Sequence, residues 1–301
     1  MATLLRRAAR VSFSGSLLSA GSRHGRVHAL SYFGSNNRNS STSSKIKVDL
    51  DSSSGIAVVK FQGPPVNSMG VDFLTEMAIS LDKLELDKNC RGIILTSAVP
   101  KIFSAGLDIM DMYEKTPEHY EQFWRGVQDL WLKLYSSSKI MIAAINGASP
   151  AGGCLMALTC DYRILADNPR YKIGLNEAQL GIVAPFWFKD SMVNTVGYRI
   201  TEESIQFGVM YSPADALKIG LVDQVVPEDK VFSTATETME KWFDIPDHAR
   251  QISKSMMRKP TIDRMLANRE DDIKNFVGFI SKDSIQKSLG MYMAMLKMKK
   301  G

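Results

Sequence analysis

The sequence predicts an α/β fold, because strand-like and helix-like segments alternate along most of the chain. The opening order is strand, strand, helix, and a further strand and helix follow after a glycine turn. A third strand then leads through a second glycine turn into a short apolar helix. Helices that connect successive strands favour a core with crossover connections, and the chain beyond Glu177 has mainly helical patterns.

The first half of the chain begins with a polar and apolar alternation that is typical of a hairpin, because a Ser/Gly turn separates its two strands. Pro117 is suited to the first turn of the second helix. The apolar spacing of Phe73, Leu74, Met77, Leu81 and Leu84 predicts the first helix. Strands are expected at 45–50, 55–61, 92–97, 139–145 and 162–166, and helices at 71–86, 117–135 and 153–159.

The second half is mostly helical, with one more short strand at 220–226. Ser212 is the expected cap of a helix that begins at Pro213. We expect a core domain at 45–229 and a C-terminal helical region at 230–301. Helices are expected at 185–196, 202–208, 213–219, 235–243, 247–257 and 284–297.

The N-terminal segment 1–44 holds six arginines and no acidic residue, and its apolar residues can line one face of a basic amphipathic helix. This pattern is typical of a mitochondrial transit peptide, and it predicts a location in the mitochondrial matrix. A disordered basic tail is the alternative. Without these arginines, 31 basic residues stand against 32 acidic ones, so nucleic-acid binding loses its main support. No run approaches the roughly 20 apolar residues of a membrane span.

Cysteine and histidine give no sign of a metal site. Cys90, Cys154 and Cys160 have no metal-ligand spacing, and a reduced core environment suits them better than a disulfide framework. His119 and His248 are the only histidines after the leader, and neither lies in a hydrolase or zinc-enzyme motif. A Ser/His hydrolase and a zinc enzyme are therefore disfavoured.

Two glycine turns and a carboxylate are the strongest candidates for chemistry. The turns are Phe103-Ser-Ala-Gly-Leu-Asp108 and Ala148-Ser-Pro-Ala-Gly-Gly153, and the carboxylate is Glu177. Each turn follows a short buried strand and opens a helix, where free N–H groups favour an anion. Glycines that only allow close packing are the alternative interpretation. Neither turn matches a nucleotide phosphate loop.

The sequence resembles the crotonase, or enoyl-CoA hydratase/isomerase, superfamily over nearly all of 45–301. The resemblance rests on the two turns, on Cys160-Asp-Tyr-Arg163, on Glu177-Ala-Gln-Leu-Gly-Ile182 and on Ala214-Asp-Ala-Leu-Lys-Ile-Gly-Leu-Val-Asp223. It implies a spiral of ββα repeats followed by a helical trimerisation region. It also implies a homotrimer that binds an acyl-CoA thioester and needs no separate cofactor or metal.

The resemblance also implies roles for individual residues. The backbone N–H groups of Ala105 and Gly152 would form an oxyanion hole for the thioester oxygen, and losing one such donor typically lowers the rate about 100- to 1000-fold. Asp108 is expected to cap the helix after the first turn rather than to act as a base. Substrate contacts are implied for Ala105, Gly106, Leu107, Asp108, Ile109, Gly152 and Asn176, and contacts with the CoA nucleotide for Lys282 and Lys287.

The number of carboxylates decides between reactions within this family. Hydratases of the superfamily use two glutamates, but Leu155 occupies the position of the first one and Glu177 that of the second. One carboxylate can remove a proton from C2 of a cis- or trans-3-enoyl thioester and return it at C4, which produces the trans-2-enoyl isomer needed in β-oxidation. A carboxylate that acts first as a base and then as an acid works best when apolar surroundings raise its pKa. Enoyl-CoA hydration, or a non-catalytic acyl-CoA-binding subunit, remains an alternative.

Overall fold

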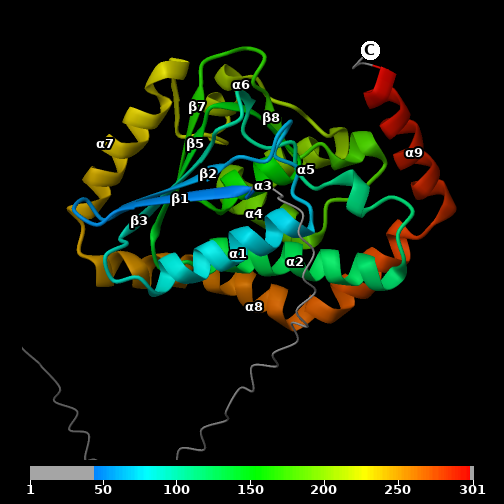
Figure 1. Cartoon of the computed structure of the whole chain (residues 1–301), viewed down its shortest axis with the longest axis horizontal. Helices are drawn as coiled ribbons and strands as arrows, with labels where there is room; N and C mark the ends of the chain where they lie inside the picture. Colours follow the sequence, from blue (N-terminus) through cyan, green and yellow to red (C-terminus); the bar gives the residue numbers. More distant parts are fainter. Residues whose placement is uncertain (1–43, 299–301) are drawn as a thin grey trace, which may run out of the picture. The chain divides into compact units, whose positions relative to one another are not determined.

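The computed structural model of the chain describes residues 44–298 (Figure 1). The predicted transit peptide therefore lies outside the described residues, except for Ser44. None of the helices in the described range combines the length and the apolar character that a membrane crossing needs. The α/β fold expected from the alternating pattern is confirmed.

The main sheet of the described chain has six strands in the order β1-β2-β3-β5-β7-β9. β1 and β2 form the expected antiparallel hairpin, and every other neighbouring pair is parallel. The strands are β1 (Ile46–Asp51), β2 (Ile56–Phe61), β3 (Gly92–Ser97), β5 (Ile140–Ile145), β7 (Tyr162–Ala166) and β9 (Gln224–Val226).

A second, small sheet stands beside the first and was not expected from the sequence. Its strands β4 (Lys101–Ile102), β6 (Gly147–Pro150) and β8 (Ile173–Gly174) are parallel to one another. Each of them follows a strand of the main sheet in the chain. The order of main strand, small strand and helix repeats along the chain, which fits the spiral of ββα repeats.

Helices cover both faces of the main sheet (Figure 1). α1 (Val71–Leu86), α2 (Pro117–Ser136) and α3 (Gly152–Thr159) share one core with one set of strand residues, including Ile93 and Met141. α7 (Val231–Phe243) packs on the other face against Ile94 and Ile142. Neighbouring residues of β3 and β5 thus point into different cores, and this explains why both strands are buried along their whole length.

The segment between β8 and α7 is mainly helical, as expected. It contains α4 (Phe186–Val196), α5 (Tyr198–Phe207) and α6 (Pro213–Lys218), and Ser212 caps α6 by accepting from the Asp215 amide. β9 is shorter than the strand expected at 220–226. The predicted domain boundary at residue 229 falls within the short 3-10 helix η3 (Glu228–Lys230), and the division itself stays a prediction.

The C-terminal region contains α8 (Asp247–Ile280) and α9 (Asp283–Met298). The expectation that a helix ends near residue 257 was wrong, because α8 continues through Pro260. Contacts on both sides of the proline hold the helix: Arg258 donates to the Tyr135 and Thr159 carbonyls, and Thr261 accepts from Asn194. α8 lies along α2 below the main sheet in Figure 1.

Candidate active site

The small sheet brings the three candidate segments together. Parallel strands end at the same edge of a sheet, so the residues that follow β4, β6 and β8 are neighbours. Two backbone hydrogen bonds extend this link, from Ser149 to the Lys172 carbonyl at 2.9 Å and from Ala151 to the Gly174 carbonyl at 2.8 Å. The two glycine turns and Glu177 therefore meet at one edge of the small sheet.

The two glycine turns touch each other through their glycines. A Cβ atom added to Gly106 would lie 2.9 Å from the Gly152 nitrogen, and one added to Gly152 would lie 3.2 Å from the Leu107 nitrogen. Gly106 also has φ +89°, which only glycine adopts readily. Gly106 and Gly152 thus allow a close approach of two backbones that side chains would prevent.

The amide of Ala105 is not free, contrary to the expectation that it serves the oxyanion hole. It donates to the Val66 carbonyl at 2.9 Å, and this bond fixes the first turn to the loop before α1. The Leu107 amide, two residues further on, has no acceptor among residues 44–298, and neither has the Gly152 amide. The geometry therefore replaces Ala105 by Leu107 as the partner of Gly152.

Glu177 begins the short 3-10 helix η2 (Glu177–Leu180) and is 7% exposed. Neither carboxylate oxygen has a hydrogen-bond partner in the described chain. Burial raises the pKa of Glu177 from 4.5 to about 7. The side-chain oxygen of Asn176, the preceding residue, is also buried without a partner. The carboxylate is thus poised to gain or lose a proton near neutral pH, beside a second polar group that is free to contact a ligand.

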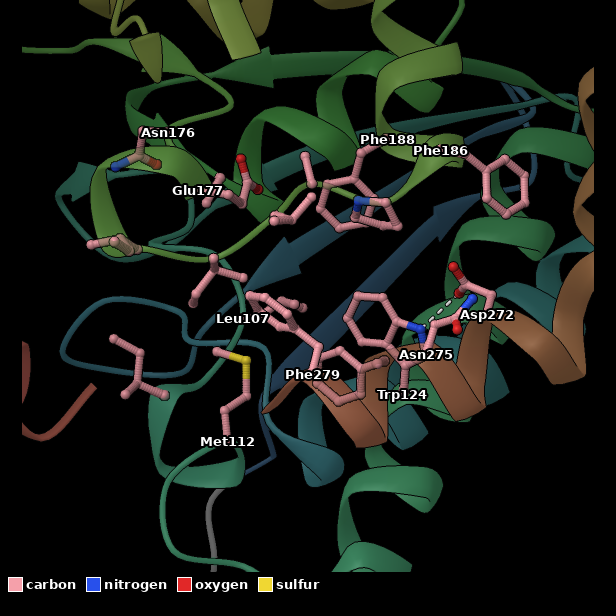
Figure 2. Close-up of a pocket in the computed structure, with 18 of the residues that line it drawn as sticks. Leu107, Met112, Trp124, Asn176, Glu177, Phe186, Phe188, Asp272, Asn275 and Phe279 are labelled. Atoms are coloured by element: carbon pink, nitrogen blue, oxygen red, sulfur yellow. Dashed lines mark hydrogen bonds between the residues drawn. The ribbon is translucent and has the colours of Figure 1, made fainter. Parts of the chain in front are cut away.

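A cavity of about 700 Å³ opens in front of Glu177 (Figure 2). The predicted site residues Ala105, Leu107, Ile109, Asn176 and Glu177 line it, together with Lys282. Most of the remaining wall is apolar, as an acyl chain requires. It includes Met112, Trp124, Leu180, Ile182, Phe186, Phe188, Phe276 and Phe279.

Other predicted site residues lie outside the cavity wall. Asp108 accepts from the Met110 amide at 2.9 Å and caps the short 3-10 helix η1 (Ile109–Asp111), whereas α2, the helix expected after this turn, is capped by Thr116. Gly106 and Gly152 lie directly behind the wall formed by their neighbours in the chain. Lys287 is exposed on α9 and does not line the cavity.

The aromatic part of the wall was missed from the sequence. Trp124 lies on α2, and Phe276 stacks on its ring with centroids 3.9 Å apart. Asp272, Phe276 and Phe279 follow one another at spacings of four and three residues on α8, which places them on one face of that helix. This spacing was the available signal, but it did not reveal that the face is turned toward Glu177.

Leu155 lies in α3 and is 3% exposed, in the position that holds a glutamate in hydratases of the resembled superfamily. It packs in the main core and does not line the cavity. The two carboxylates in the cavity wall are Glu177 and Asp272, and Figure 2 shows them on opposite sides of the cavity. Glu177 is therefore the single carboxylate beside the two free amides.

The comparisons with known proteins agree with this geometry. Residues 51–299 match the family described as enoyl-CoA hydratase/isomerase. The chain is 59% identical over 285 residues to "Enoyl-CoA delta isomerase 1, mitochondrial" of Rattus norvegicus, across 95% of this chain and 97% of that protein. The mouse protein of the same name is 57% identical, with the same coverage. The crystal structure of human mitochondrial delta3-delta2-enoyl-CoA isomerase superposes with a TM-score of 0.84 at 59% identity, and the match covers 85% of this chain and all of that one.

Proposed function

The chain belongs to the enoyl-CoA hydratase/isomerase family, and from this premise we propose that it is a Δ3,Δ2-enoyl-CoA isomerase. The substrate is a 3-enoyl-CoA thioester, cis or trans, and the product is the trans-2-enoyl thioester that β-oxidation consumes. One observation carries the proposal: a buried carboxylate without partners lines a cavity at the edge where two neighbouring backbone amides, those of Leu107 and Gly152, have no acceptor in the described chain.

In the proposed reaction, Glu177 first removes a proton from C2 of the substrate. The electron pair of the broken C–H bond forms an enolate, whose oxygen accepts hydrogen bonds from the Leu107 and Gly152 amides. The C3=C4 double bond then shifts to C2=C3 as C4 takes the proton back from Glu177. Because the same group is base and then acid, a pKa of about 7 suits both steps.

The absence of an acid at position 155 favours isomerisation over hydration. Hydration requires a water molecule that is both positioned and deprotonated, and the buried apolar side chain of Leu155 can do neither. The apolar wall around Glu177 also disfavours water at the reacting carbons. Coenzyme A enters as part of the substrate, and the proposed chemistry needs no further cofactor.

The proposal extends to location and assembly. The rat and mouse relatives carry "mitochondrial" in their names, and the leader 1–44 is rich in arginine and free of acids. We propose a mitochondrial protein of the matrix on this basis. The homotrimer implied by the family resemblance also stays a proposal, as does a contact of Lys282 with the CoA moiety at the cavity mouth.

The Glu177→Gln variant tests the proposed reaction. We expect its turnover of 3-hexenoyl-CoA to fall about 1000-fold, because the amide cannot shuttle a proton. Formation of the conjugated 2-enoyl thioester can be followed by its ultraviolet absorbance. Calorimetric titration with hexanoyl-CoA is expected to show that the variant still binds a CoA ester.

The matched control is Glu240→Gln, which makes the same exchange at an exposed position of α7 and should leave turnover unchanged. Substantial turnover by Glu177→Gln would contradict the assignment of the base. Rapid hydration of crotonyl-CoA by the wild-type protein would favour a hydratase. Binding of CoA esters without turnover of any enoyl thioester would indicate a non-catalytic subunit.

A further inference from the structure

A second carboxylate, Asp272, lies in the wall of the mostly apolar cavity, to which Lys274 and Asn275 of the same helix also contribute (Figure 2). It belongs to α8 and is 8% exposed. Its position on the side opposite Glu177 excludes it from the proton transfer proposed above. Burying a carboxylate in a pocket for a hydrocarbon chain is unfavourable unless hydrogen bonds stabilise it. The hydrogen-bond partners of Asp272 therefore indicate its role.

One oxygen of Asp272 is fully occupied by neutral donors. Oδ2 accepts from the Trp124 indole at 2.8 Å, from the Gln128 amide at 2.7 Å and from the Trp187 indole at 3.1 Å. These donors come from α2 and α4, so the carboxylate joins three helices around the cavity. None of the three is a cation, and Arg269 contacts Gln128 and Asp129 instead.

The other oxygen of Asp272 has a different environment. Oδ1 makes no hydrogen bond within residues 44–298, yet it is not among the polar atoms that are sealed from solvent. Asp272 lines the cavity, and Oδ1 is its one carboxylate oxygen without a donor among the described residues. The indoles of Trp124 and Trp187 hold the carboxylate through its other oxygen.

The cavity runs along α8 from Asp272 to Phe279. These residues are seven positions apart in the helix, which corresponds to roughly 10 Å along its axis. Glu177 and Asp272 lie on opposite sides of the cavity in Figure 2, so an acyl chain that starts beside Glu177 has to cross the cavity before it meets Asp272. Short chains end before that point, and long chains reach it.

We propose that Asp272 limits the length of the hydrocarbon chain that the cavity accepts, a role that rests on the proposed isomerase function. A long chain that covers Oδ1 displaces water from a carboxylate and offers no hydrogen bond in return. Removing water from a charged group is far less favourable than removing it from a neutral amide. Asp272 thus acts as a specificity residue, which disfavours long chains without touching the reacting carbons.

The Asp272→Asn variant tests this role, since the amide keeps an oxygen for the indole donors and removes the charge. We measure kcat/KM for 3-enoyl-CoA thioesters from hexenoyl to hexadecenoyl. The ratio of the hexadecenoyl value to the hexenoyl value is expected to rise about three- to tenfold in the variant. Asp272→Glu, which extends the carboxylate into the cavity, is expected to lower the same ratio.

Opposite shifts of the ratio in the two variants distinguish this role from a purely structural one. A purely structural role would lower kcat/KM alike for substrates of every chain length. The control Asp263→Asn makes the same exchange on α8 at an exposed carboxylate that pairs with Lys259 outside the cavity, and should leave the ratio unchanged. An unaltered ratio in folded Asp272→Asn overturns the proposal. If Asp272→Asn does not fold, Asp272→Glu provides the test: a lower ratio supports the chain-length role, and an unchanged or higher ratio overturns it.

The proposed isomerase function is judged separately, by wild-type turnover of 3-hexenoyl-CoA. If the wild type lacks turnover, calorimetric binding of hexanoyl-CoA and palmitoyl-CoA still tests the role of Asp272. The preference for the long chain should then increase in Asp272→Asn by the same three- to tenfold. An equal preference in wild type and variant overturns the chain-length role.

Discussion

At the scale of single residues, the protonation of Glu177 is the most informative property of the site. Its pKa is raised to about 7 because burial outweighs the lowering effect of its own backbone N–H. An ordinary exposed glutamate would be fully ionised at neutral pH, but it would be a weak base toward a carbon acid. Burial makes this carboxylate a stronger base and leaves it able to donate the proton afterwards.

The pH dependence of the reaction follows from this raised pKa. Glu177 must be ionised in the free enzyme to accept the C2 proton, so kcat/KM is expected to rise with pH and to level off above about 7. The measurement is a series of initial rates with 3-hexenoyl-CoA between pH 5 and pH 9. Enzyme held at each pH and then assayed at neutral pH controls for inactivation. A midpoint near 4.5, the value for an exposed glutamate, would show that burial does not control the base.

Sequence patterns located the site residues unequally well. Glu177 was found through the motif around it, and Leu155 indicated that a second acid was missing. Ala105 was the wrong donor, because the motif identifies the turn but not which of its amides faces the cavity. That choice depends on the bond between the Ala105 amide and the Val66 carbonyl, a contact between distant parts of the chain. Asp272 was not singled out from the sequence, because its contacts with Trp124 and Trp187 likewise join distant parts of the chain.

At the scale of elements, the turn that carries the Leu107 amide is held by a buried polar network. Asn67 is fully buried with φ 50°, and its side chain donates to the Phe103 carbonyl at 2.9 Å. The Ser104 hydroxyl donates to the Asn67 carbonyl at 2.8 Å and accepts from the Gly106 amide at 3.1 Å. The network fixes the backbone on both sides of the turn, and in the proposed mechanism it would thereby preorganise the Leu107 amide for the enolate oxygen.

Removing the Ser104 hydroxyl should therefore lower the rate without weakening substrate binding. In Ser104→Ala, the Gly106 amide loses its acceptor and the Leu107 amide is less well aligned. We expect kcat to fall about 10- to 100-fold, because the hydrogen bond to the oxygen strengthens only as charge develops. KM should change less than about threefold. The steady-state constants with 3-hexenoyl-CoA provide the test.

A spectroscopic measurement separates this effect from general loss of structure. Binding of a 2-enoyl thioester should shift its ultraviolet absorbance when the amides polarise the carbonyl, and Ser104→Ala should reduce that shift. The control is Ser149→Ala, since the Ser149 hydroxyl is equally buried on the neighbouring turn but has no hydrogen-bond partner. Equal effects of the two substitutions would refute the positioning role of Ser104.

The elements themselves were predictable where they were long and periodic. The helices at 71–86 and 117–135 agree with α1 and α2 almost to the residue. The small sheet was missed because strands of two to four residues have no detectable period. The second half of α8 was missed because Pro260 normally ends a helix, and only contacts with other elements keep the helix continuous.

At the scale of the whole molecule, Asp161 connects the sheet to the C-terminal helices. Its backbone and side chain both pair with Met141 of β5. Its side chain also forms ion pairs of 2.7 Å with Lys254 and with Arg258 of α8. Because α8 further along carries Asp272, the geometry of the cavity wall depends on how α8 docks on the sheet. The sequence marked Asp161 only as part of a motif.

Neutralising Asp161 should consequently destabilise the entire fold. In Asp161→Asn, the amide oxygen can still accept from the Met141 amide, but Lys254 and Arg258, whose side chains are only 10% and 13% exposed, lose their counter-charge. We expect the free energy of unfolding to fall by roughly 3–5 kcal/mol, measured by urea denaturation at pH 6. The control Asp263→Asn breaks an exposed ion pair with Lys259 and should change it by less than about 1 kcal/mol.

The pH dependence of this loss distinguishes an electrostatic cause from altered packing. Burial lowers the pKa of Lys254 from 10.5 to about 8 even with Asp161 beside it, and removing the carboxylate lowers that pKa further. Between the lowered pKa of Lys254 in the folded variant and 10.5, its value in the unfolded chain, the unfolded variant binds more protons than the folded one. The free energy of unfolding of the variant therefore rises with pH over this range. The difference between Asp161→Asn and the wild type should therefore shrink from pH 6 to pH 9. A difference that stays constant over this range would indicate that Asp161 acts through packing rather than charge.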